Sequence, residues 1–130
     1  MAVHPKSTVV FIEKLNVPFH IGVTEEERIF AQPVHIDVEC ELRDAVVAGD
    51  EVSQSLSYST LAEKIRALAG DGRVRKLLET LAAHIADACL EDARIRVVVI
   101  SLRKLGKIHD ADAVGVTRRF IRMDQADYNR

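Results

Sequence analysis

The chain of 130 residues has no tryptophan, only two cysteines and three prolines, and aromatic residues make up just 5% of it. With a net charge of −2 it lacks the basic, aromatic-rich surface of a nucleic-acid-binding domain. No apolar run approaches the roughly 20 residues needed to cross a bilayer, and residues 1–6 contain no apolar core of a secretory signal. We therefore expect no nucleic-acid partner, no membrane span and a cytoplasmic protein.

Several catalytic and cofactor motifs are also missing. The sequence contains no Gly-rich phosphate loop, no His-Glu-x-x-His, no Cys-x-x-Cys and no Gly-x-Ser-x-Gly. Its five histidines do not form a convincing ligand set. Cys40 and Cys89 fall on apolar patterns typical of packed thiols. We expect no metal, no cofactor and no disulfide.

The composition is that of a globular domain. Hydrophobic residues make up 48% of the chain and charged residues 29%. A chain of this length can bury a core without disulfides or metals. We expect one domain over residues 1–130.

Four segments have the patterns of β-strands. Thr8 to Val17 is apolar and β-branched and is followed by Pro18. Val34 to Leu42 alternates strictly between apolar and polar residues, as a half-buried antiparallel strand does. Ile95 to Leu102 contains a continuous β-branched run, typical of a strand covered on both faces, and Val114 to Met123 supplies the last strand.

Two helices are expected between the second and third strands. The sequence from Thr60 to Glu63 has the capping-box pattern, which predicts a helix running to about Ala69 and ending at the glycines of segment 70–72. A second helix is indicated up to about Leu90 by apolar residues at helical spacing, namely Leu78, Leu81, Ala82, Ile85 and Cys89.

The order strand, strand, helix, helix, strand, strand predicts an α+β fold. Two helices cover only one face of such a sheet, whereas the third strand is apolar on both faces. A small open sheet also has two edges that need to be paired or hidden, and closing several subunits into one barrel meets both needs. The sequence therefore predicts an oligomer.

Four polar clusters are candidates for chemistry. The loop of residues 22–28 carries an acidic run, which on its own is more often a solvated surface. Tyr58 stands at the start of a helix, where packing is the commoner role. Glu79 interrupts an apolar helix, and Lys104 and Lys107 follow the buried third strand, where sites often form. Individually, none of these signals is specific.

Their joint order is specific. Ile-Gly-Val-x-x-x-Glu-Arg, Leu-Ser-Tyr, Leu-Leu-Glu-Thr-Leu-Ala, Leu-x-Lys and Val-Gly-Val follow one another between Phe11 and Val116. This arrangement resembles the dihydroneopterin aldolases. The resemblance implies the tunnelling fold, in which two helices pack on a four-stranded antiparallel sheet and four subunits close a barrel. Two such rings commonly stack into an octamer, and the pterin substrate binds between subunits.

The resemblance also implies roles for individual residues. Glu79 corresponds to the carboxylate that pairs with the aminopyrimidine edge of the pterin, and Leu78 beside it is a further substrate-binding residue. Glu27 corresponds to the acidic loop residue near the substrate side chain, Tyr58 to a tyrosine from the adjacent subunit, and Lys104 to the active-site lysine. Glu27, Tyr58 and Lys104 are the expected catalytic residues.

The implied reaction is the retro-aldol cleavage of dihydroneopterin to hydroxymethyl-dihydropterin and glycolaldehyde, a step toward folate. It needs neither a Schiff base nor zinc, because the dihydropterin imine accepts the electron pair. A lysine base works near neutral pH only where burial or positive neighbours favour its uncharged form. Arg103 and Lys107 are the candidate neighbours of Lys104.

Three alternatives remain open. The sequence also looks like the related dihydroneopterin triphosphate epimerases at Glu25-Glu26-Glu27, Lys104-Leu105 and Ala111-Asp112-Ala113-Val114. In such an enzyme Arg103 and Lys107 would hold the triphosphate. The chain is alternatively a non-catalytic pterin-binding protein that keeps the barrel. A zinc-dependent enzyme of the same fold is disfavoured by the missing histidine cluster.

Overall fold

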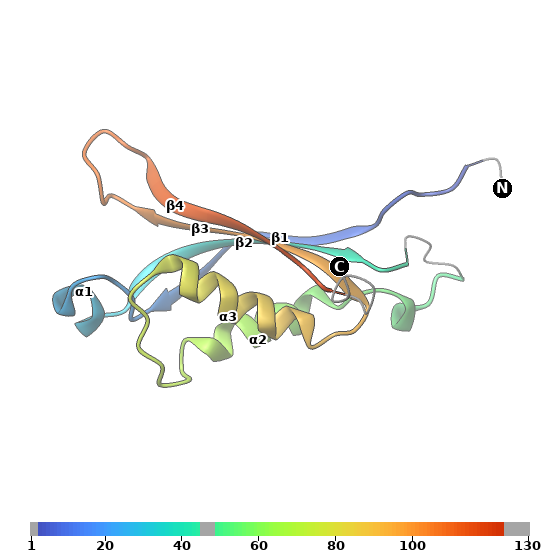
Figure 1. The fold of residues 1–130 in the computed structure, drawn as a ribbon, viewed down its shortest axis with the longest axis horizontal. Helices are drawn as coiled ribbons and strands as arrows, with labels where there is room; N and C mark the ends of the chain where they lie inside the picture. Colours follow the sequence, from blue (N-terminus) through green and yellow to red (C-terminus); the bar gives the residue numbers. More distant parts are fainter. Residues whose placement is uncertain (1–2, 45–48, 124–130) are drawn as a thin grey trace.

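The computed structural model describes residues 3–44 and 49–123. One antiparallel sheet with the strand order β1-β2-β3-β4 is built from β1 (Val9–Phe19), β2 (Gln32–Leu42), β3 (Ile95–Leu105) and β4 (Ala113–Ile121). Both long helices, α2 (Tyr58–Leu68) and α3 (Leu78–Leu90), lie on one face of this sheet (Figure 1). The connections contain the short helix α1 (Glu25–Ile29) and a 3₁₀ turn, η1 (Val52–Gln54). The predicted α+β order of ββααββ is confirmed.

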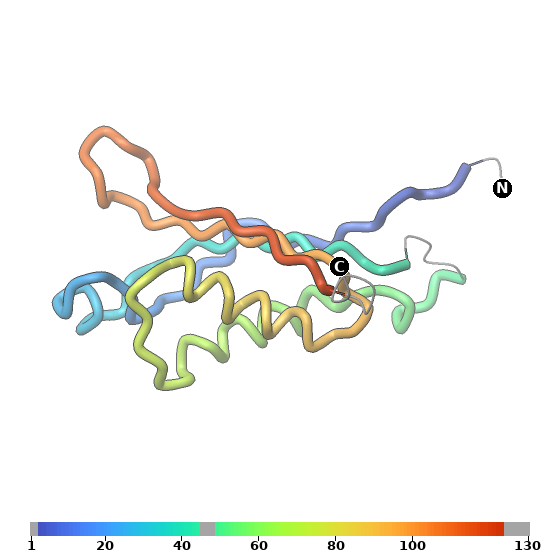
Figure 2. The backbone as a smooth tube through the Cα atoms, viewed as in Figure 1, coloured from blue at the N-terminus to red at the C-terminus, as the bar shows by residue number. Residues whose placement is uncertain are grey.

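The core lies between the sheet and the two helices. Along β2 every second residue is buried, from Val34 to Leu42, as the alternation predicted. Cys40 of β2 and Cys89 of α3 are both free and buried. Helix α3 spans the predicted residues and buries the stripe of Leu81, Ala82, Ile85, Ala86 and Cys89. Backbone tubes show these layers most simply (Figure 2).

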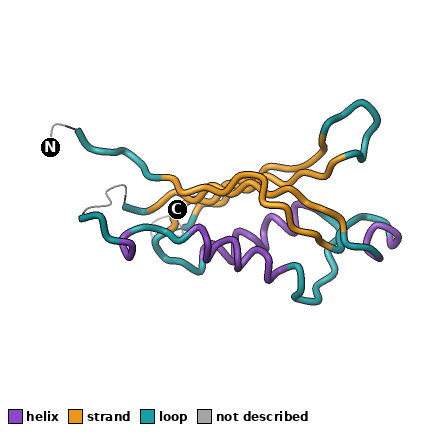
Figure 3. The backbone as a smooth tube through the Cα atoms, turned by 180° about the vertical axis from the view of Figure 1, so that it is seen from behind, coloured by secondary structure: helices purple, strands orange, loops and turns teal. Residues whose placement is uncertain are grey.

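The other face of the sheet has no helix on it among the described residues (Figure 3). Val97 and Val99 of β3 point to this face, since Val98 and Ile100 point to the core. Phe11 of β1 lies in the same row as Val99 and is 58% exposed. The predicted apolar character of both faces of β3 is confirmed, and this face is left partly uncovered in a single chain.

Strand β1 differs from its predicted form in two ways. It continues through Pro18, which pairs with Pro33 of β2, although the sequence indicated an end there. Proline has no amide N–H to donate, but neither proline of this pair costs the sheet a hydrogen bond. On the outer side of β1 there is no further strand, and β2 pairs with β3 only from His35 onward. A one-residue bulge also interrupts β1 between Ile12 and Leu15 and keeps both on the core side.

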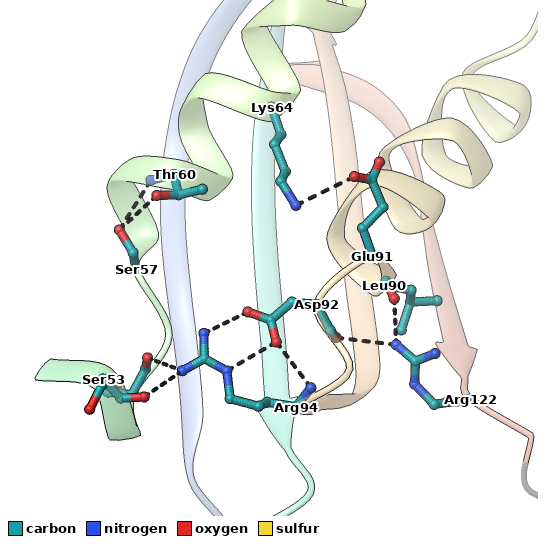
Figure 4. A network of polar contacts seen from close by, with 10 residues as sticks. Ser53, Ser57, Thr60, Lys64, Leu90, Glu91, Asp92, Arg94 and Arg122 are labelled. Atoms are coloured by element: carbon teal, nitrogen blue, oxygen red, sulfur yellow. Dashed lines mark hydrogen bonds and ion pairs between the residues drawn. The ribbon is translucent and has the colours of Figure 1, made fainter.

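Helix α2 begins earlier than expected. The predicted cap at Thr60 is wrong: Ser57 is the N-cap, and its hydroxyl accepts hydrogen bonds from the Thr60 amide and hydroxyl. Below this cap, Arg94 donates to the main-chain oxygens of Ser53 and Ser55 and pairs with Asp92 at 2.7 Å (Figure 4). These bonds fasten the segment that precedes α2 to the start of β3.

No helix among the described residues is long and apolar enough to cross a membrane.

Gly115 on β4 lies close against the main chain of β3. A Cβ atom at this position would lie 1.8 Å from the main-chain oxygen of Leu102. Gly115→Ala should therefore force the strands apart and lower the free energy of unfolding by about 3 kcal/mol. Gly70→Ala is the matched control, because its Cβ would meet no atom closer than 4.0 Å. Urea denaturation of both variants checks this, and equal midpoints would contradict it.

Candidate active site

Three segments distant in the sequence meet at one end of the molecule: the loop between β1 and β2, the start of α3 and the hairpin between β3 and β4 (Figure 2). They line an open cavity of about 430 Å³. Its walls are formed by Gly22, Val23 and Glu27 of the first segment, residues 76–79 of the second, and Lys104, Lys107, Ile108 and Val114 of the third.

Lys104 is one of two buried charged residues among those described, with 8% of its surface exposed. It lies on the same side of β3 as Ile100 and Leu102, so that its stem packs on the core face. Its Nζ donates to the main-chain oxygen of Ile21 at 3.4 Å and lies 3.6 Å from Oε2 of Glu27. Strand β3 thus places the Lys104 amine at the cavity.

Glu27 is held by a capping box. The Thr24 hydroxyl accepts a hydrogen bond from the Glu27 amide, and the Glu27 carboxylate accepts one from the Thr24 amide. The same carboxylate lies 3.9 Å from Nζ of Lys107. The hydrogen bond from the Thr24 amide lowers the pKa of Glu27 most. Desolvation, the next largest effect, raises it, and Lys104, the Thr24 hydroxyl and Lys107 lower it further, so that the pKa lies below its usual value. Glu27 is therefore an anion between two amines.

Main-chain contacts fix the loop that carries Glu27. Gln32 donates through Nε2 to the carbonyl oxygens of Ile21 and Glu27, at 2.8 and 2.7 Å. Arg28 donates to the carbonyl oxygens of Gly22 and Val23. These two side chains close the loop on itself, and neither was identified as a site residue from the sequence.

Glu79 and Leu78 occupy the first turn of α3 and line the same cavity. The Glu79 side chain lies at the exposed rim, while Leu78 is half-buried below it. Arg118 of β4 donates to the main-chain oxygen of Glu79 at 3.0 Å and so anchors this turn to the sheet. Lys76, which the sequence did not single out, also lines the cavity.

Tyr58 lies elsewhere in the chain. It is 64% exposed at the start of α2 and lines a separate hollow with Ile12, Leu15 and Arg66. The fold therefore brings Glu27, Leu78, Glu79 and Lys104 together within one chain, and Tyr58 is not among them.

Arg103 is not a neighbour of the Lys104 amine. Successive residues of a strand point to opposite faces, so Arg103 lies on the helix-free side of the sheet, where it pairs with Asp37 at 2.6 Å. The prediction that Arg103 lies beside Lys104 is wrong, whereas the prediction for Lys107 is confirmed by their shared carboxylate. Within the described residues, no group of three or more His, Cys, Asp or Glu side chains is placed to hold a metal ion.

Comparison with known proteins gives one family. Residues 10–119 match the family model FolB, dihydroneopterin aldolase. Dihydroneopterin aldolase of Escherichia coli K12 is 33% identical over 109 residues, which cover 83% of this chain and 88% of that protein. The E. coli enzyme in complex with neopterin superimposes with a TM-score of 0.78 at 32% identity over 87% of this chain and 98% of that one. FolB of Vibrio cholerae gives 0.79 at 28% identity, over 88% and 98%.

Gly22 allows Glu27 to reach the amines. A Cβ at position 22 would lie 2.2 Å from Cβ of Glu27, so Gly22→Ala should push Glu27 away from the Thr24 amide and from Lys104. Loss of these contacts should raise the pKa of the Glu27 carboxyl toward its ordinary value. Carboxyl-carbon NMR titration measures this, and an unchanged Glu27 titration would contradict the described geometry.

Proposed function

The chain belongs to the dihydroneopterin aldolase family, and we propose that Glu27, Glu79 and Lys104 of one subunit form its pterin site with Tyr58 of a neighbouring subunit. Its activity is the retro-aldol cleavage of dihydroneopterin to 6-hydroxymethyl-dihydropterin and glycolaldehyde, an aldehyde-lyase reaction on the route to folate. The observation that supports the site most strongly is the approach of Glu27 and Lys104 to 3.6 Å, at a cavity that Glu79 also lines.

Glu79 is the proposed anchor of the pterin ring. The aminopyrimidine edge offers two parallel N–H donors, which match the two oxygens of a carboxylate. Leu78 and Val114 supply apolar contact for the faces of the ring. The exposed position of Glu79 at the rim leaves its oxygens open to the ligand. Once the ring covers this rim, the contact is desolvated and becomes stronger.

Lys104 and Glu27 are proposed to act on the substrate side chain. The hydroxyl on the second side-chain carbon loses its proton to Lys104 through a water, the bond between the first and second carbons breaks, and the ring imine accepts the electron pair. Glycolaldehyde leaves. In the single chain Nζ of Lys104 lies against a carboxylate oxygen of Glu27 and the carbonyl oxygen of Ile21. Substrate hydroxyls that engage Glu27 would loosen this pair and release the amine for proton transfer.

Tyr58 then delivers a proton to the first side-chain carbon, which completes hydroxymethyl-dihydropterin. Tyr58 begins α2 and lines a separate hollow, so that it is not part of the cavity of its own chain. In a ring of subunits, each chain could supply its Tyr58 to the cavity of a neighbour. The uncovered face and the two edges of the sheet favour such a ring. We accordingly propose a tetramer or octamer of single-domain subunits in the cytoplasm.

The epimerase alternative loses part of its support. Arg103, expected to hold a triphosphate, lies on the opposite face of the sheet, although Lys76 and Lys107 do line the cavity. The two reactions are distinguished by incubating the protein with dihydroneopterin and, separately, with its triphosphate. Glycolaldehyde from the unphosphorylated substrate is the expected result. Epimer formation from the triphosphate alone would establish the epimerase, and binding without turnover would indicate a non-catalytic protein.

The roles of the two main residues are separable by kinetics. Lys104→Ala should lower kcat by about 100-fold or more with pterin affinity nearly unchanged, since it removes a proton-transfer group. Glu79→Ala should weaken neopterin binding by at least tenfold, since it removes a charge-assisted contact. Stopped-flow turnover and fluorescence titration measure the two quantities. The reverse pattern would refute the assignment.

Sharing of the site between subunits is tested by mixing inactive variants. Co-assembly of Lys104→Ala with Tyr58→Phe should restore part of the activity, because some interfaces then combine an intact lysine with an intact tyrosine. Co-assembly of Lys104→Ala with Glu27→Gln is the matched control and should restore none, since both residues line the same chain's cavity. Equal activity of the two mixtures would exclude a shared site.

A further inference from the structure

Arg75 is a buried arginine beside the pterin cavity, with only 3% of its surface exposed. It stands in the segment between α2 and α3, just before the residues that form one wall of the cavity. Its guanidinium lies over the ring of buried Phe19, at the end of β1, with 5.8 Å between Cζ and the ring centroid. The resemblance to the aldolases and the reaction described above assign no task to this residue.

Nearly every donor of Arg75 has a partner. Nε donates to Nδ1 of His84 at 2.8 Å, and the terminal nitrogens donate to both carboxylate oxygens of Asp71 and to the main-chain oxygen of Leu68. Four contacts therefore use four of the five N–H groups of the side chain. A buried charge is costly unless it is paired in this way, so the network fixes Arg75 in one position.

The main chain of Arg75 touches the opposite wall of the cavity. Its carbonyl oxygen accepts a hydrogen bond from the Gly22 amide at 3.3 Å, and the two segments form a parallel bridge between Ile21 and Arg75. Ile21 also supplies the oxygen that receives Lys104 Nζ. The arginine thus stands where the Glu27 loop, the lysine and the start of α3 come together.

We propose that Arg75 is a positioning residue of this aldolase site, whose anchored guanidinium sets the distance between the wall carrying Glu27 and Lys104 and the wall carrying Glu79. This inference rests on the proposed function. The ring held by Glu79 and the side chain acted on by Lys104 belong to one rigid substrate, so the spacing of the walls decides whether both ends are engaged at once.

The network requires a neutral His84. A guanidinium N–H is donated to Nδ1, so this nitrogen must carry a free lone pair. Burial, followed by Arg75 and Arg73, lowers the pKa of His84 against the opposing charges of Asp71 and Asp87. His84 is neutral above that lowered pKa, and the hydrogen bond is present there. As the pH falls through it, His84 gains a proton, loses its acceptor and repels Arg75.

Arg75→Met keeps most of the side-chain volume and removes the guanidinium that binds Asp71 and His84. Relative to the wild-type protein it should lower kcat/KM for dihydroneopterin by at least tenfold, with neopterin bound more weakly and faster hydrogen exchange at the Gly22 amide. Arg73→Met is the matched control: this arginine pairs with the same Asp71, but its side chain is 60% exposed. Its kinetics should stay within about twofold of wild type. A folded Arg75→Met protein with the kinetics of the control would overturn the proposal.

His84 variants test the same network if Arg75→Met fails to fold. His84→Ala removes one hydrogen bond and leaves the ion pair with Asp71, and it should raise the neopterin dissociation constant severalfold at neutral pH. His84→Asn offers an amide oxygen that does not titrate. It should bind neopterin as the wild type does at neutral pH, and keep that affinity under acidic conditions in which the wild type loses it.

The outcomes separate the two claims. If the wild-type protein releases no glycolaldehyde, the proposed function fails, and the neopterin and hydrogen-exchange measurements still decide the role of Arg75. If the wild type is active and the pH profiles of wild type and His84→Asn superimpose, the positioning role is wrong while the aldolase stands.

Discussion

The alternation of side chains along strand β3 decides which charged group reaches the cavity. Val98, Ile100 and Leu102 point to the helices, and Lys104 continues that series to the point where the helical cover ends. The side chain of Lys104 is therefore buried along its stem and lines the cavity. Arg103, one residue earlier, faces the other side and pairs with Asp37. A slip of one residue in register would exchange the two cations and leave the cavity without its buried amine.

The cavity depends on that amine meeting a loop of fixed shape. The Ile21 carbonyl accepts from both Lys104 and Gln32, and the next residue, Gly22, donates to the main chain of Arg75. The dipeptide Ile21-Gly22 thus contacts β3, the start of β2 and the segment before α3. Thr24 then turns the loop into α1 and directs Glu27 back toward the amine. Most of these bonds involve main-chain atoms, so they fix the path of the loop as well as its side chains.

The same fold keeps Tyr58 away from the cavity. The Ser57 cap and the bonds of Arg94 to the preceding segment fasten the start of α2 in place (Figure 4). A single chain consequently holds an incomplete set of the predicted residues at the cavity, together with a sheet face that no helix of residues 3–44 and 49–123 covers. Both features have one explanation if neighbouring chains complete the site and cover the sheet.

The sequence by itself determined the order of elements, the alternation of β2 and the span of α3, because periods of two and 3.6 residues are local properties of a chain. It also determined the family, through five short blocks in order. It did not decide which capping pattern is used: Thr60 to Glu63 carries the motif without capping α2, while Thr24 to Glu27 forms the box. Nor did it reveal the partners of Arg75 or the side of the sheet taken by Arg103. Arg103 pairs with Asp37, 66 residues away, and the main chain of Arg75 meets Gly22 in the loop after β1. Only the packed tertiary structure brings these segments together.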